Sequence, residues 1–143
     1  PLEKSFELAK LIAKKDKLYF FGGGKGESEI LENWATQIPN TENLAGKLSI
    51  SDELQKISKL KTMISMDSAN MHLASLVGTR CVSVWGSTHY FAGFLGYGQS
   101  IDDVIEVKDL TCRPCSVFGD KECFRGDWAC LQEIDIQKIN DKI

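Results

Sequence analysis

The stretch Met66-Asp67-Ser68-Ala69-Asn70-Met71-His72-Leu73-Ala74 joins two apolar runs. The run before it, residues 62–66, is typical of a buried strand, and the run over 69–77, closed by Gly78, is typical of a helix. Asp67 and Ser68 both favour the N-cap position, so the helix is predicted to begin there. A strand that enters a helix through a short polar turn leaves backbone N–H groups unpaired at the positive end of the helix dipole. This joint is therefore predicted to bind an anion such as phosphate.

The pattern around this joint alternates between helices and strands. Apolar periodicity predicts helices over 2–15, 27–37, 51–61, 69–77 and 134–143, and strands over 17–21, 62–66, 81–85 and 104–107. Residues 40–49 are expected to be irregular. Such alternation predicts an α/β fold with a mostly parallel, Rossmann-like sheet and helices on both faces. The length of 143 residues favours a single domain spanning 1–143.

Ligands of such sheets bind where the strands end. Three loops leave the carboxyl ends of predicted strands, namely Gly22–Gly26, Asp67–His72 and Gly86–Gln99. The last of these is long and aromatic, which suits a lid or a face that packs on another domain. We expect the candidate site to lie among these three loops.

The glycine loop fits neither common phosphate-loop pattern. Lys25 is followed by Gly26 and not by Ser or Thr, and the spacing does not match G-x-G-x-x-G. The loop is either a plain turn or a place where backbone approaches a ligand closely. In the second case Gly22 and Gly23 would approach the ligand, and Glu27 or Glu29 would accept hydrogen bonds from sugar hydroxyls.

Polar side chains of the other two loops are also candidate phosphate ligands. His72 lies in the first turn of a helix that is otherwise almost wholly apolar, so we expect a buried ring that needs a partner. An ordinary packed or solvated histidine is the alternative. Ser87 and Thr88 can offer hydroxyl and backbone N–H groups to phosphate. A helix cap is the ordinary role for Asp67.

Four of the five cysteines lie close together in the sequence. Cys112-x2-Cys115-x7-Cys123-x6-Cys130 matches a zinc site in its first half, but the second pair lacks the C-x2-C spacing. Zinc ligands, reduced structural thiols and disulfides are therefore all open interpretations of this cysteine segment, residues 112–130. The basic side chains within it, Arg113, Lys121 and Arg125, would also suit an anionic partner.

Composition narrows the class of protein. The net charge of −3 argues against a nucleic-acid surface, and no apolar run approaches the roughly 20 residues of a membrane span. Hydrophobic residues make up 43% of the chain and charged residues 26%, as in ordinary globular proteins. We expect a cytoplasmic protein.

Three blocks of sequence resemble those of the lipopolysaccharide heptosyltransferases, which are ADP-heptose glycosyltransferases. The blocks are Asn43-Leu44-Ala45-Gly46-Lys47-Leu48-Ser49, the opening stretch 66–74, and Val84-Trp85-Gly86-Ser87-Thr88-His89. The Cys112-Arg113-Pro114-Cys115 segment resembles some members as well. Ala69 stands where the family has glycine, and Tyr90 stands where it has proline.

The resemblance implies the second, donor-binding half of a GT-B type glycosyltransferase with an absent N-terminal acceptor domain. It implies an ADP-sugar donor, with ADP-heptose as the first choice, and a role in lipopolysaccharide or surface glycan synthesis. Donor phosphates would contact Ser68, Ala69, His72, Ser87 and Thr88. Asp67 would either cap the helix or hold a hydroxyl of the donor sugar. The general base and the site for a glycan or lipid-linked acceptor would lie in the absent domain, so this fragment alone would be inactive.

The same resemblance bears on cofactors and location. The sequence has no D-x-D metal motif, so no cofactor is expected beyond zinc at the cysteines. Any contact with the inner face of the cytoplasmic membrane would be peripheral and confined to the full-length protein. The alternative function is a non-catalytic α/β interaction domain with a zinc-stabilised, cysteine-rich surface.

Overall fold

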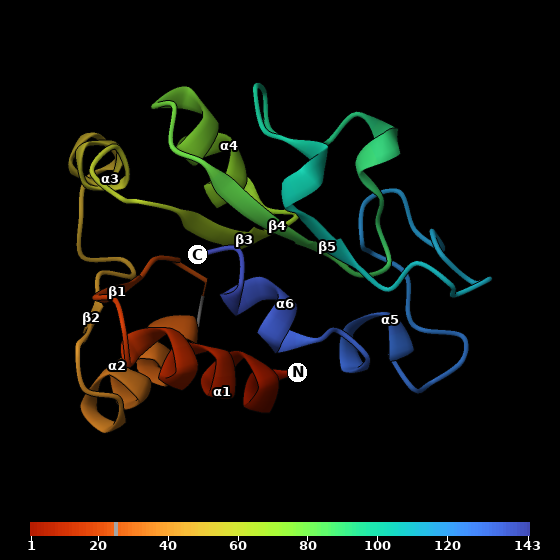
Figure 1. Ribbon diagram of the computed structural model, residues 1–143, viewed down its shortest axis with the longest axis horizontal. Helices are drawn as coiled ribbons and strands as arrows, with labels where there is room; N and C mark the ends of the chain where they lie inside the picture. Colours follow the sequence, from red (N-terminus) through yellow and green to blue (C-terminus); the bar gives the residue numbers. More distant parts are fainter. Residues whose placement is uncertain (25) are drawn as a thin grey trace. The chain divides into compact units, whose positions relative to one another are not determined.

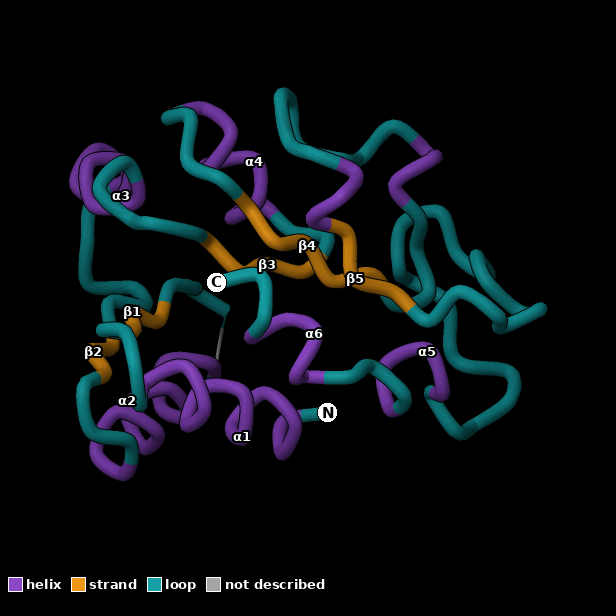
Figure 2. Tube along the Cα trace, in the orientation of Figure 1, coloured by secondary structure: helices purple, strands orange, loops and turns teal. Residues whose placement is uncertain are grey.

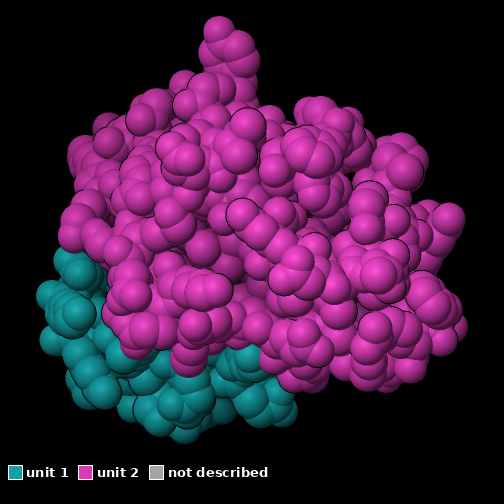
Figure 3. Space-filling model, turned by 45° about the vertical axis from the view of Figure 1, so that its right-hand side comes forward, with its two compact units in different colours: residues 1–53 teal, residues 54–143 magenta. Residues whose placement is uncertain are grey.

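The computed structural model describes residues 1–24 and 26–143. Lys25, which the sequence places in the glycine loop, lies outside the described residues. The chain divides into two compact units, residues 1–53 and residues 54–143 (Figure 3). Helix α3 (Ile50–Ile57) is the stretch of chain that runs from the first unit into the second.

The first unit contains a two-stranded parallel sheet. It comprises α1 (Leu2–Ala13), β1 (Leu18–Phe20), α2 (Glu27–Gln37) and β2 (Thr41–Asn43), with β1 paired to β2. Its core is formed by Ala9, Ala13, Phe20 and Ile38, against which the rings of Phe6 and Trp34 pack. The expectation of irregular structure over 40–49 is wrong for β2, because a three-residue strand of polar side chains carries no hydrophobic alternation.

The second unit is built on a three-stranded sheet (Figure 2). Strands β3 (Met63–Met66), β4 (Cys81–Trp85) and β5 (Val104–Glu106) lie in the order β3-β4-β5 and are parallel throughout. Helix α4 (Ala69–Leu76) lies on one side of this sheet, and α5 (Ala129–Gln132) and α6 (Ile136–Asn140) lie on the other (Figure 1). The α/β class with parallel strands is therefore confirmed.

The register of the sheet places two predicted loops side by side. Met66 at the end of β3 pairs with Val84, and Trp85 at the end of β4 pairs with Glu106. The loops that follow β3 and β4 consequently leave the same edge of the sheet, which we call the carboxyl edge. Single 3-10 turns interrupt the long loop at Tyr90–Ala92 and precede β5 at Ile101–Asp103.

Large apolar side chains anchor the sheet of the second unit. Trp85, Val82 and Met71 are fully buried, and the indole N–H of Trp85 donates to the hydroxyl of Ser83 over 2.9 Å. Burial of such side chains stabilises each by roughly 1.5–3 kcal/mol relative to exposure. This packing fixes the strand ends from which the candidate site projects.

The C-terminal helix is shorter than its pattern suggests. A single helix was expected over 134–143, whereas α6 covers Ile136–Asn140 and a separate α5 precedes it. Asp135 caps α6 by accepting from the N–H of Gln137 over 2.9 Å, which explains why the helix begins after residue 134. Over the described residues, no helix has the length and apolar character needed to cross a membrane.

Candidate functional site

Helix α4 begins with open backbone donors. Ser68 is its N-cap, with extended backbone angles of φ −154° and ψ 169°. The Ser68 hydroxyl does not cap the helix, because it lies 3.0 Å from the hydroxyl of Ser65. Among the residues described, the N–H groups of Ala69 and Asn70 have no acceptor. The helix therefore presents two unpaired donors at the positive end of its dipole.

The loop after β4 contains a second set of open donors, whose direction follows from the partners of its carbonyl groups. Cys115 and Ser116 donate their N–H groups to the carbonyl of Ser87 over 3.1 and 3.2 Å. The Arg113 guanidinium donates to the carbonyls of Gly86 and Thr88. Three consecutive carbonyls after β4 are thus all engaged by the cysteine segment.

Peptide geometry determines where the matching N–H groups point. The peptide bonds of this loop are trans, so each N–H is antiparallel to the carbonyl of the same peptide unit. The N–H groups of Ser87, Thr88 and His89 therefore point away from the cysteine segment. No acceptor for them occurs in the described part of the chain. Successive unpaired N–H groups in a turn form an anion-binding nest.

Both sets of donors lie at the carboxyl edge. Met66 and Val84 are paired neighbours, so Ala69 and Asn70 on one loop and Ser87–His89 on the next follow adjacent strands. Unpaired N–H groups on two adjacent loops can share the oxygens of one polyanionic ligand, and a helix N-terminus adds favourable charge. This edge can therefore bind an extended anion such as a diphosphate.

A buried ion cluster lies beneath the second loop. Arg113, Glu106 and His89 have side-chain exposures of 4%, 8% and 14%. One Glu106 oxygen lies 3.1 Å from the Arg113 guanidinium and 3.3 Å from Nε2 of His89. Nδ1 of His89 accepts from the N–H of Phe91, which leaves Nε2 as the nitrogen that carries the proton.

Comparison with known proteins identifies the family. The sequence model of glycosyltransferase family 9 (heptosyltransferase) matches residues 1–122. The chain belongs to glycosyltransferase family 9. The match includes β3, α4, β4 and the loop that follows β4, so all the open donors described above lie within the family's own sequence pattern.

Individual family 9 relatives support this assignment. The chain is 25% identical over 136 residues to lipooligosaccharide heptosyltransferase 2 of Campylobacter jejuni serotype O:6, covering 92% of this chain and 42% of the relative. The serotype O:2 protein of the same name is 25% identical over 132 residues, covering 90% and 40%. The chain thus spans about two fifths of the length of these curated relatives.

A solved structure shows the same fold. The glycosyl transferase family 9 protein from Veillonella parvula superposes with a TM-score of 0.72 at 19% sequence identity. The superposition covers 99% of this chain and 39% of that protein. At this identity the likeness establishes the fold and nothing more.

The family 9 chain places the side chains of the first loop differently from the sequence expectation. Ser68, Ala69 and His72 are exposed, and Asp67 is half-buried with no hydrogen bond inside the described ranges. The expectation of a buried His72 ring on a buried helix is wrong. Helix α4 buries only Met71 and Ala74, because it packs on one face of the sheet with one side only.

Side chains of the second loop are partly covered. Ser87 is half-buried and Thr88 is buried with 6% of its surface exposed. A Cβ added at Gly119 would lie 3.6 Å from the Thr88 methyl group, so that side chain packs against the cysteine segment. The open donors of Ser87 and Thr88 are therefore their backbone N–H groups.

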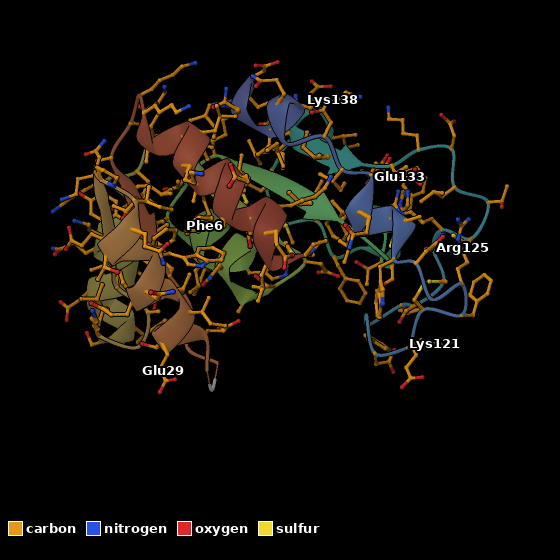
Figure 4. All side chains as sticks on the ribbon, turned by 90° about the horizontal axis from the view of Figure 1, so that it is seen from below. Phe6, Glu29, Lys121, Arg125, Glu133 and Lys138 are labelled. Atoms are coloured by element: carbon orange, nitrogen blue, oxygen red, sulfur yellow. The ribbon has the colours of Figure 1, made fainter. Side chains whose placement is uncertain are left out.

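In the glycine loop of the first unit, backbone N–H groups bind a carboxylate from the same unit. The Glu27 carboxylate accepts from the N–H groups of Gly23 and Gly24 over 3.3 and 2.8 Å. Gly22 has a φ of 151°, and a Cβ added there would lie 3.1 Å from the same Glu27 oxygen. Glu29 projects outward from α2 (Figure 4). Glu27 therefore closes the loop onto the start of α2, and contacts of Gly22, Gly23, Glu27 and Glu29 with a donor stay predictions.

The cysteine segment contains free thiols. Cys112, Cys115 and Cys123 are half-buried and Cys130 is buried. The described residues include no group of three or more His, Cys, Asp or Glu side chains placed to hold a metal ion. Zinc at these cysteines therefore stays a prediction.

The role of the basic residues in this segment also differs from expectation. Arg113 does not face an anionic partner, because its guanidinium is buried and bonded to Glu106 and to backbone carbonyls. Arg125 pairs with Asp127 at 2.7 Å, and Lys121 projects from the segment (Figure 4). Sequence reasoning missed the cluster of Arg113, Glu106 and His89 because its members lie in three separate predicted segments, a loop, a strand and the cysteine segment. An available signal was the arginine within Cys112-Arg113-Pro114-Cys115.

Proposed function

We propose that the carboxyl edge of the β3-β4-β5 sheet binds the diphosphate of a nucleotide-sugar donor for glycosyl transfer. The observation that carries this proposal is the juxtaposition of unpaired N–H groups on two adjacent loops, at Ala69–Asn70 and at Ser87–His89. The donor we propose is an ADP-sugar, and specifically ADP-heptose. The likeness to two lipooligosaccharide heptosyltransferases supports heptose as the transferred sugar.

The arrangement of donors suits chemistry at a diphosphate. In glycosyl transfer the bond between the anomeric carbon and the diphosphate oxygen breaks, and negative charge develops on that oxygen. Preorganised N–H groups aimed at developing charge stabilise a transition state by about 2.7–4 kcal/mol for each donor removed in measured cases. Because these donors can take up the charge, we propose that no divalent metal is required.

The remaining parts of the reaction belong to the rest of the protein. The chain spans about two fifths of its curated relatives, so we propose that acceptor binding and general base catalysis lie outside these residues. The acceptor would be a glycan or lipid-linked saccharide of lipopolysaccharide or another surface glycan. The attacking acceptor hydroxyl would lose its proton to a base contributed by that other part.

Calorimetry of the full-length protein tests the proposal. ADP, UDP, GDP and CDP would be titrated in parallel, without added metal and then with Mg²⁺. We expect ADP to bind with a dissociation constant below the millimolar range and to bind more tightly than the other three. Absence of ADP binding at millimolar concentration would refute the proposal.

A further inference from the structure

Arg113 has an unusual set of partners for a residue outside the open donor set. Its Nε donates to the carbonyl of Gly86, and its Nη2 donates to the carbonyl of Thr88 over 3.3 Å. Its Nη1 donates to the carbonyl of Val107 over 2.8 Å and to Glu106 over 3.1 Å. One guanidinium thus joins the loop after β4 to the end of β5.

The guanidinium is held rigidly in this position. With 4% of its side chain exposed, Arg113 has little room for another rotamer, and its partner Glu106 is equally enclosed at 8%. His89 lies 3.3 Å from the same Glu106 oxygen and stacks on Tyr90 with ring centroids 4.4 Å apart. The planar fork of arginine can hold several acceptors at fixed angles, which a lysine ammonium cannot.

The direction of the open N–H groups follows from the hydrogen bonds that Arg113 donates. When Arg113 holds the carbonyls of Gly86 and Thr88, the N–H groups of Ser87 and His89 are directed the opposite way, toward the open side of the carboxyl edge. We propose that Arg113, fixed by Glu106, is a positioning residue that aims these N–H groups at the donor diphosphate. This inference rests on the proposed function and names a residue that controls how tightly the carboxyl edge binds phosphate.

The same sheet provides a matched control. Arg80 precedes β4 and pairs at 2.6 Å with Asp103, the residue before β5, whereas Arg113 pairs with Glu106, the last residue of β5. Arg80 thus links the starts of β4 and β5, and Arg113 links the loop after β4 to the end of β5. Arg80 therefore lies at the amino edge, away from the open donors. Variants of either arginine should therefore lose stability. Only variants of Arg113 should misdirect the N–H groups and so bind the diphosphate more weakly.

The experiment measures ADP and AMP affinities of full-length Arg113→Lys and Arg80→Lys by calorimetry, beside their melting temperatures. We expect Arg113→Lys to bind ADP about tenfold more weakly, the loss typical of one misdirected hydrogen bond to a charged oxygen. The affinity for AMP, which has one phosphate fewer, should fall less than the affinity for ADP. The ratio of ADP affinity to AMP affinity should therefore fall. Arg80→Lys should keep the wild-type affinity ratio, even if its melting temperature falls as much as that of Arg113→Lys.

Three results would overturn the inference. An unchanged ADP affinity in Arg113→Lys would contradict it while leaving the proposed function standing, and so would equal losses in both arginine variants. Failure of the wild-type protein to bind ADP would refute the proposed function, and this inference with it. If Arg113→Lys does not fold, Glu106→Gln replaces it, with a smaller fall in the same affinity ratio expected and an unchanged ratio counting against the inference.

Discussion

Ala69 occupies the first position of α4 and offers a direct test of the donor site at the scale of one residue. Ala69→Asp would place a carboxylate beside the open N–H groups of the first turn. A carboxylate at a helix N-terminus is stabilising by about 0.3–1 kcal/mol, so the unfolding free energy should hold or rise. ADP affinity should fall at least tenfold, because the new charge competes with and repels the diphosphate. Urea unfolding and calorimetry measure the two effects.

Leu76→Asp is the matched control for this charge. Leu76 ends the same helix and is 75% exposed, so the carboxylate would lie at the negative end of the dipole. We expect a small loss of stability and unchanged ADP affinity. Equal loss of ADP affinity in both variants would show that net charge, and not the helix start, governs binding.

The five thiols of the chain should differ in reactivity. Hydrogen bonds from backbone N–H groups, of Trp128 first and then of Arg125 and Gly126, lower the pKa of Cys123. Burial raises the pKa of Cys81 to about 12 and also raises the pKa of Cys130. The reactive species is the thiolate, so Cys123 should be alkylated first at pH 7. Mass spectrometry after timed iodoacetamide treatment measures the order, and faster labelling of Cys81 would contradict it.

The same labelling reveals whether zinc is bound. Thiolates that ligate zinc are protected until a chelator removes the metal. We expect Cys123 to react equally fast with and without chelator. Protection of Cys112, Cys115, Cys123 and Cys130 that a chelator abolishes would favour the zinc interpretation, as would one zinc per chain by elemental analysis.

At the scale of elements, the Arg80–Asp103 pair ties β4 to the turn before β5. Two Arg80 nitrogens donate to the Asp103 carboxylate over 2.8 and 2.6 Å, and another donates to the carbonyl of Lys142. Asp103→Asn should lower the unfolding free energy at pH 7 by about 1–2 kcal/mol, a modest figure because Arg80 is half-exposed.

This loss should depend on pH. The hydrogen bonds from Arg80 hold the pKa of Asp103 below its ordinary value. A carboxylate with a lowered pKa in the folded state contributes stability above its unfolded pKa, near 3.9, and that stability disappears as pH falls through the folded value. The difference between wild type and Asp103→Asn in urea unfolding should therefore shrink below about pH 4. A constant difference from pH 7 to pH 3 would show that the charge of Asp103 is unimportant.

Elements with strong apolar patterns were predictable from the sequence. The predicted helix over 27–37 and strand over 81–85 match α2 and β4, because each has a clear period and a sharp boundary. The strand β2 and the helix α5 were missed, since the first has three polar residues and the second has only four residues. Short elements depend on partners distant in sequence, which local patterns do not reveal.

The candidate site was predictable in its backbone and less so in its side chains. The polar joint at Asp67–Ser68 and the loop at Ser87–Thr88 indicated the correct strand ends. The orientation of the N–H groups was not predictable, because it depends on Arg113, a residue more than 20 positions further along the chain. The exposure of His72 was not predictable either, because an apolar composition does not reveal which sides of a helix are covered.

At the scale of the whole molecule, the chain is much shorter than the proteins it resembles. Family 9 relatives are more than twice as long, since this chain covers 42% and 40% of the two that match. In the proposed reaction the carboxyl edge would bind the donor and stabilise the developing charge, and catalysis would also need an acceptor held in line.

The central claim is that backbone N–H groups at the carboxyl edge bind the donor diphosphate. Hydrogen–deuterium exchange of the full-length protein, with and without saturating ADP, tests it most directly. Exchange should slow in peptides covering residues 67–72 and 86–90, because an amide bonded to phosphate oxygen exchanges slowly. The peptides of β3 and α6 should not change, and they serve as internal controls. Protection confined to other segments, with 67–72 and 86–90 unaffected by bound ADP, would contradict the account.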